Sequence, residues 1–80
     1  MNCPKFQNGE YITPILPDED AIRYFKDVAT FYGEDLFDFV RGEFRVVDHI
    51  LTAWGVYYKC SLGDNQKLFM VPEKWAKFIY

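Results

Sequence analysis

The chain has 80 residues, of which half are hydrophobic and one in five is aromatic, and its formal net charge is −3. This length provides for a single core, so we expect one domain over residues 1–80, and the apolar content argues against disorder. No apolar run approaches the ~20 residues of a membrane-spanning helix, and the first residues lack the apolar stretch of a secretory signal, so we expect a cytoplasmic protein.

The first 17 residues contain Pro4, Gly9, Pro14 and Pro17 and are predicted to be extended, with residues 10–16 forming a short strand or edge strand. A helix is predicted over residues 18–32, because Asp18 can cap its start and Gly33 can end it. The apolar residues that recur at helical spacing on its expected inner face are Ala21, Ile22, Phe25, Val28, Ala29 and Tyr32.

Two further helices are predicted in the middle of the chain. The first covers residues 34–41, with Leu36, Phe37 and Val40 facing inward and Gly42 ending it. The second covers residues 44–54, where one side collects Val46, Val47, Ile50, Leu51 and Trp54. The β-branched pair Val46-Val47 leaves a strand as the alternative for this second segment.

From Val56 onward the period changes from helical to alternating, which predicts a β-hairpin over residues 56–71 with a turn at residues 63–65. Pro72 then opens a short C-terminal helix whose Trp75, Phe78 and Ile79 cover the hairpin. The predicted fold class is α+β: a small single domain of about three helices, a β-hairpin and a short C-terminal helix.

No arrangement typical of catalysis or of metal binding is present, so we expect neither an enzyme, a metal site nor a cofactor. Cys3 and Cys60 belong to no Cys/His cluster and are predicted to be free thiols in a reducing compartment. His49 is the only histidine, and nothing supplies a third, orienting group for a Cys/His pair. The glycine-rich phosphate loops and the zinc-hydrolase motif are also missing from the sequence.

The acidic residues concentrate in the first half of the chain. Residues 1–40 have a net charge of −5 and residues 41–80 a net charge of +2. Acidic and aromatic residues alternate along one stripe of the predicted first helix, and the acidity continues into the next segment. The predicted partner-binding residues are Asp20, Tyr24, Asp27, Phe31, Glu34, Asp35 and Asp38. Alternatively, these carboxylates serve only as helix-start residues and a solvated face.

The hairpin offers a second candidate surface. Lysines and aromatic rings alternate there, and such a face can stack bases and neutralise phosphates. The residues of this alternative nucleic-acid-binding face are Tyr57, Lys59, Lys67 and Phe69. Because Trp75 and Phe78 can instead cover Phe69, direct binding of nucleic acid is the less favoured interpretation.

The segment Phe-Tyr-Gly-Glu-Asp-Leu-Phe-Asp at residues 31–38 resembles the Tyr-Tyr-Gly-Glu-Asn-Leu segment of barstar-type ribonuclease inhibitors. It covers about a tenth of the chain, and the strand that follows it in that family is not evident, so neither fold nor target is carried over. In profile the chain is similar to the small inhibitors that bacteriophages and mobile elements encode, including anti-CRISPR and anti-restriction proteins.

The sequence therefore predicts a small, non-enzymatic protein-binding module. We expect it to act as an inhibitor or modulator of a host protein or nucleoprotein complex, occupying a surface with its acidic and aromatic residues. The alternative is a small nucleic-acid-binding regulator that uses the hairpin face. We expect a monomer or a homodimer.

Overall fold

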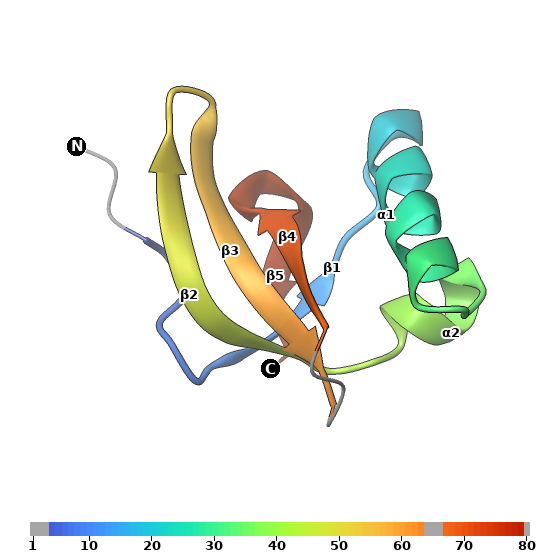
Figure 1. The fold of residues 1–80 in the computed structure, drawn as a ribbon. Helices are drawn as coiled ribbons and strands as arrows, with labels where there is room; N and C mark the ends of the chain where they lie inside the picture. Colours follow the sequence, from blue (N-terminus) through green and yellow to red (C-terminus); the bar gives the residue numbers. More distant parts are fainter. Residues whose placement is uncertain (1–3, 64–66, 80) are drawn as a thin grey trace.

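A curled antiparallel sheet carries two helices on one side in the computed structural model (Figure 1), which describes residues 4–63 and 67–79. The helices are α1 (Glu19–Phe31) and α2 (Leu36–Val40), and both lie in the connection between the first two strands. The strands are β1 (Tyr11–Pro14), β2 (Phe44–Thr52), β3 (Gly55–Leu62), β4 (Leu68–Pro72) and β5 (Ala76–Phe78), with a 3₁₀ turn, η1 (Glu73–Trp75), before β5. No helix among the described residues is long and apolar enough to cross a membrane.

The sheet must curl strongly, because its two outermost strands follow each other in the chain. Its order is β4-β3-β2-β1-β5, yet only η1 separates β4 from β5. Four strand spacings of a flat sheet would put these edges about 19 Å apart. The chain from Pro72 to Ala76 can span at most about 14 Å. The sheet is therefore rolled toward a barrel, and η1 bridges its two edges.

The helices close the core of this curled sheet. Ala21, Phe25 and Ala29 form the buried face of α1, as the helical spacing predicts, whereas Ile22, which was expected on the same face, is 40% exposed. The Asp18 carboxylate accepts a hydrogen bond of 2.9 Å from the backbone N–H of Ala21, which confirms the predicted cap. From α2, the ring of Phe39 is fully buried against the rings of Tyr32, Phe44 and Phe69.

Helix α1 also covers the outer edge of β4. The Tyr24 hydroxyl donates a hydrogen bond to the backbone carbonyl of Met70, and the Tyr32 hydroxyl donates to that of Lys67. An uncovered edge strand presents carbonyl groups that can pair with another chain. In this fold a tyrosine hydroxyl satisfies one such carbonyl group of β4, that of Met70, and a second satisfies the carbonyl group of Lys67, just before the strand.

The prediction of a third helix over residues 44–54 was wrong, because this segment is strand β2 and the turn after it. The pairing register with β3 shifts between Val46 and Asp48, so Val47 is the extra residue of a β-bulge. Before the bulge Phe44 and Val46 are buried; beyond it, His49 and Leu51 pair with the buried Tyr58 and Val56. The inner face thus changes from even to odd positions, and the resulting apolar pattern imitates a helical period.

The predicted C-terminal helix was also wrong, since the chain after Pro72 forms η1 and then strand β5. Strand β1 exists where a strand was expected, but it lies between β2 and β5 and not at an edge. The hairpin is confirmed as β3 and β4, and the central residues of its predicted turn lie outside the described residues. The fold is α+β, as expected, but the described residues form five strands and two helices.

The inner face of α2 also differs from the prediction. Leu36 and Val40 pack against the core, but the third inward residue is Phe39, while Phe37 points outward. Positions i, i+3 and i+4 share one face of a helix, whereas neighbouring positions are about 100° apart. Because Phe37 and Phe39 are both aromatic, composition alone could not distinguish the two faces.

Candidate functional site

The acidic stripe lies on α1, as predicted, and most of its side chains are exposed. Asp20, Asp27 and Phe31 are exposed, and 65% of the Phe31 surface is open to solvent. Their spacing of seven and four residues places them along one side of the helix. The structure therefore brings these three predicted residues onto one surface.

Tyr24, the fourth residue of the stripe, is turned toward the body of the protein. Its ring lies against Phe25 and Trp75, with centroid distances of 5.4 and 5.5 Å. Burial raises the pKa of its hydroxyl, and the nearby Tyr57 adds to the shift. Together with the hydrogen bond to Met70, these contacts make Tyr24 a residue that attaches α1 to the sheet.

Exposed acidic residues also occupy the turn after α1 and the start of α2. Glu34, Asp35 and Asp38 are all exposed, but the Asp35 carboxylate caps α2 by accepting a 2.9 Å hydrogen bond from the backbone N–H of Asp38. Phe37 adds a large apolar side chain that is 77% exposed. We name the combined surface the acidic helical face, and its residues are Asp20, Asp27, Phe31, Glu34, Asp35, Phe37 and Asp38.

The carboxylates of this face outnumber the basic residues of the same segment. Residues 18–38 hold seven carboxylates against Arg23 and Lys26. The one contact within ion-pair distance between described residues joins His49 and Asp48 on β2, with 4.0 Å between Nδ1 and the carboxylate oxygen, and it is an ion pair only when His49 is protonated. The acidic helical face therefore presents its charge to solvent or to a partner.

The four residues proposed for the hairpin face do not share a surface. Tyr57 and Lys59 lie on the outer face of β3, where their partners on β4 are Pro72 and Met70. Phe69 pairs with Cys60 and is buried in the core. The Lys67 ammonium lies over the rings of Phe31 and Tyr32, at 5.1 and 5.8 Å from their centroids, so it belongs to the end of α1.

The described residues contain no group of three or more side chains suited to holding a metal ion. His49 is half-buried on β2 beside Asp48, and its register partner on β3 is Tyr58. Cys60 is a free thiol that is fully buried, and its burial raises its pKa to about 12. A thiol with so high a pKa is not a nucleophile at neutral pH. Cys3 lies outside the described residues.

Two features of the surface were missed from the sequence. The first is Phe37, which the helical pattern placed inward. The second is a groove with a volume of about 480 Å³ at the bridge between the sheet edges, lined in part by Lys5, Trp54, Lys74 and Lys77. These residues are far apart in the chain, so no local pattern indicates that they meet.

Comparison of the chain with models of protein families, with curated proteins and with solved structures finds no match in any of the three.

Proposed function

We propose that this chain is a non-enzymatic protein-binding module whose acidic helical face occupies a basic, nucleic-acid-binding surface of a protein partner. The module thereby inhibits or modulates that partner. The observation that carries the proposal is the exposure of Phe31 and Phe37 beside carboxylates that outnumber the basic residues of the same segment.

The negative charge of the acidic helical face indicates what kind of partner surface it binds. Carboxylates spaced along two helices favour a surface rich in lysine and arginine, which is the kind of surface that binds phosphates. Exposed phenylalanines contribute most when a partner buries them near the centre of a contact. The combination therefore favours a basic protein surface that also has an apolar recess.

Not every acidic residue is free for this role. Asp18 and Asp35 accept hydrogen bonds at helix starts, so their loss would weaken the helices themselves. Asp27 and Glu34 are exposed, and their carboxylates make no hydrogen bond to another described residue. They are the suitable positions for a test that leaves the fold intact.

The test compares two variants that change the net charge equally. Asp27→Asn/Glu34→Gln alters the acidic helical face, and Glu43→Gln/Asp48→Asn alters exposed carboxylates on and beside β2. Partners captured from a lysate by the wild-type chain should be basic nucleic-acid-binding proteins that added DNA releases. Affinity for the purified partner should fall for the first variant and not for the second.

The aromatic part is tested by Phe31→Ala and Phe37→Ala. A ring at the centre of a contact contributes about 2 kcal/mol or more, which corresponds to roughly a 30-fold change in affinity. Unchanged binding by the first charge variant and by both alanine variants would show that the acidic helical face is only solvated surface.

A further inference from the structure

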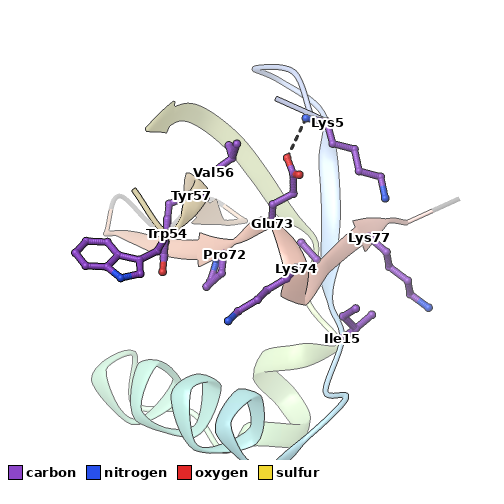
Figure 2. Close-up of a pocket in the computed structure, with 11 residues that line it drawn as sticks. Lys5, Ile15, Trp54, Val56, Tyr57, Pro72, Glu73, Lys74 and Lys77 are labelled. Atoms are coloured by element: carbon purple, nitrogen blue, oxygen red, sulfur yellow. Dashed lines mark hydrogen bonds between the residues drawn. The ribbon is translucent and has the colours of Figure 1, made fainter. Parts of the chain in front are cut away.

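The groove lies where η1 joins the two edges of the curled sheet (Figure 2). Its lining comes from the N-terminal segment, Ile15, the turn between β2 and β3, the first residues of β3, and the chain from the end of β4 into β5. None of the lining residues belongs to α1 or α2, so this site is distinct from the acidic helical face. Its volume of about 480 Å³ is within the range of small-ligand sites, roughly 300–1,000 Å³.

Three lysines give the groove its positive charge. Lys5, Lys74 and Lys77 are all exposed, and Figure 2 shows Lys5 and Lys77 extending in the same direction. Lys74 extends toward the other end of the groove, where Trp54 and Tyr57 lie. The Lys74 ammonium is 4.8 Å from the centroid of the Trp75 ring, so an aromatic face supports its position.

The single carboxylate of the lining is hydrogen-bonded to other groups of the protein. Glu73 accepts hydrogen bonds from the Tyr58 hydroxyl and, at 3.1 Å, from the backbone N–H of Lys5, as the dashed line in Figure 2 marks. Its carboxylate therefore turns toward the N-terminal segment, while Lys74 and Lys77 extend the other way (Figure 2). The open part of the groove is left with a surplus of positive charge.

Two aromatic rings lie at one end of the groove, and one of them is highly exposed. Trp54, at the turn between β2 and β3, is 86% exposed, which is the highest exposure of any large hydrophobic side chain in the described residues. Tyr57 follows it on β3 and is half-buried. A ring this exposed contributes little to the core, but it offers a flat face for stacking.

We propose that this groove binds a short segment of single-stranded nucleic acid. The lysines contact backbone phosphates, and bases stack on Trp54 and Tyr57. Positive grooves with aromatic platforms are the general means by which proteins hold single strands, and stacking contributes about 1–3 kcal/mol per base. A duplex fits less well, because its bases are already stacked and its aromatic faces are covered.

The test uses short fluorescein-labelled oligothymidylate and oligouridylate, with fluorescence anisotropy as the measurement on the full chain. Three phosphate contacts predict a slope of about −2 for log affinity against log salt concentration, since each contact contributes about −0.7 on a single strand. Trp54→Ala should weaken binding roughly 5- to 150-fold, the range expected for one lost stacking contact. Lys74→Gln/Lys77→Gln should flatten the salt slope to about −0.7.

Lys26→Gln is the matched control, because Lys26 is an exposed lysine on α1 outside the groove. It should leave both the affinity and the salt slope close to those of the wild type. Circular dichroism would check that the variants keep the fold, as expected for exposed side chains.

Three results would overturn the proposal: no binding of either oligonucleotide at low salt, equal binding by the groove variants and the wild type, or stronger binding of a duplex of the same length. Binding of a labelled polyglutamate peptide tests whether the groove recognises acidic peptides instead. If the peptide binds more tightly than the oligonucleotides and its binding depends on Lys74 and Lys77 but not on Trp54, the groove recognises acidic peptides and the assignment to nucleic acid is wrong.

Discussion

Replacing Tyr58 by phenylalanine tests how the N-terminal segment is held to the sheet. The Tyr58 hydroxyl accepts hydrogen bonds from the backbone N–H groups of Lys5 and Phe6, at 2.8 and 3.2 Å, and donates one to the Glu73 carboxylate. Phenylalanine keeps the ring and its edge contact with Phe6, whose centroid is 5.1 Å away. The substitution therefore removes the hydrogen bonds and little else.

The expected loss follows from what remains unpaired. The Lys5 N–H keeps its hydrogen bond to Glu73, but the buried N–H of Phe6 loses its partner. An unsatisfied buried donor costs about 1–3 kcal/mol, and a hydrogen bond to a charged group contributes about 1.5–3 kcal/mol. Since the two losses share one site, we expect the free energy of unfolding to fall by about 3 kcal/mol.

Urea unfolding followed by tryptophan fluorescence measures this loss, because Trp75 packs against Tyr24 and Phe25. Tyr57→Phe is the control, since the Tyr57 hydroxyl makes no hydrogen bond with another described residue. The control should change the free energy by less than about 0.5 kcal/mol. A Tyr58→Phe variant as stable as the control would refute the assigned hydrogen-bond network.

Two further predictions concern the core. Phe39→Ala should reduce the free energy of unfolding by about 3–5 kcal/mol and Phe37→Ala by less than about 0.5 kcal/mol; equal losses in urea would contradict the orientation of α2. Burial raises the pKa values of Cys60 and Tyr58 to about 12, from 9.0 and 10.0. The stability that these neutral groups contribute is complete below pH 9 and is lost as the pH rises toward 12, so urea midpoints should fall over this range. Cys60→Ala should weaken the part of this fall that begins near pH 9, and an unchanged pH profile would show that the thiol does not titrate there.

Helix α1 could be predicted because its signals are local. Asp18, the spacing of its apolar residues and Gly33 all act within one segment, and Gly33 has the positive φ of 76° that the end of a helix favours. The hairpin was predicted for the same reason, since alternation along β3 and β4 reports which face each residue occupies.

Strand β2 was missed because the evidence for it is not local. The bulge at Val47 is defined only by pairing with β3, where Cys60 and Lys59 oppose Val46 and Asp48. Without that partner, two adjacent apolar residues suggest a helical period. The exposed Ile50 and Leu51 add to the ambiguity, because this end of β2 extends beyond the core.

The acidic residues could be found from the sequence, but their roles could not be separated. Spacing alone treats Tyr24 and Phe31 alike, although Tyr24 attaches α1 to β4 and Phe31 is exposed. The distinction depends on the position of the β4 edge beside α1, which is a property of the tertiary structure. Lys67 lies beside the end of α1 for the same reason, because its carbonyl accepts a hydrogen bond from Tyr32 and its ammonium lies over the Phe31 ring, so it is not part of the proposed hairpin face.

The groove shows most clearly why charge along the chain differs from charge in space. Lys5 belongs to the acidic half of the sequence, yet the curl of the sheet places it in one groove with Lys74 and Lys77. The negative charge lies mainly in the helical connection between β1 and β2, and the remaining sequence is net positive. No residue of α1 or α2 lines the groove. Substitutions in the groove and on the acidic helical face therefore change residues that do not meet in the groove, and their effects on the free energy should be additive. Binding of protein through the helices and of single strands through the groove can therefore be tested separately in the same chain.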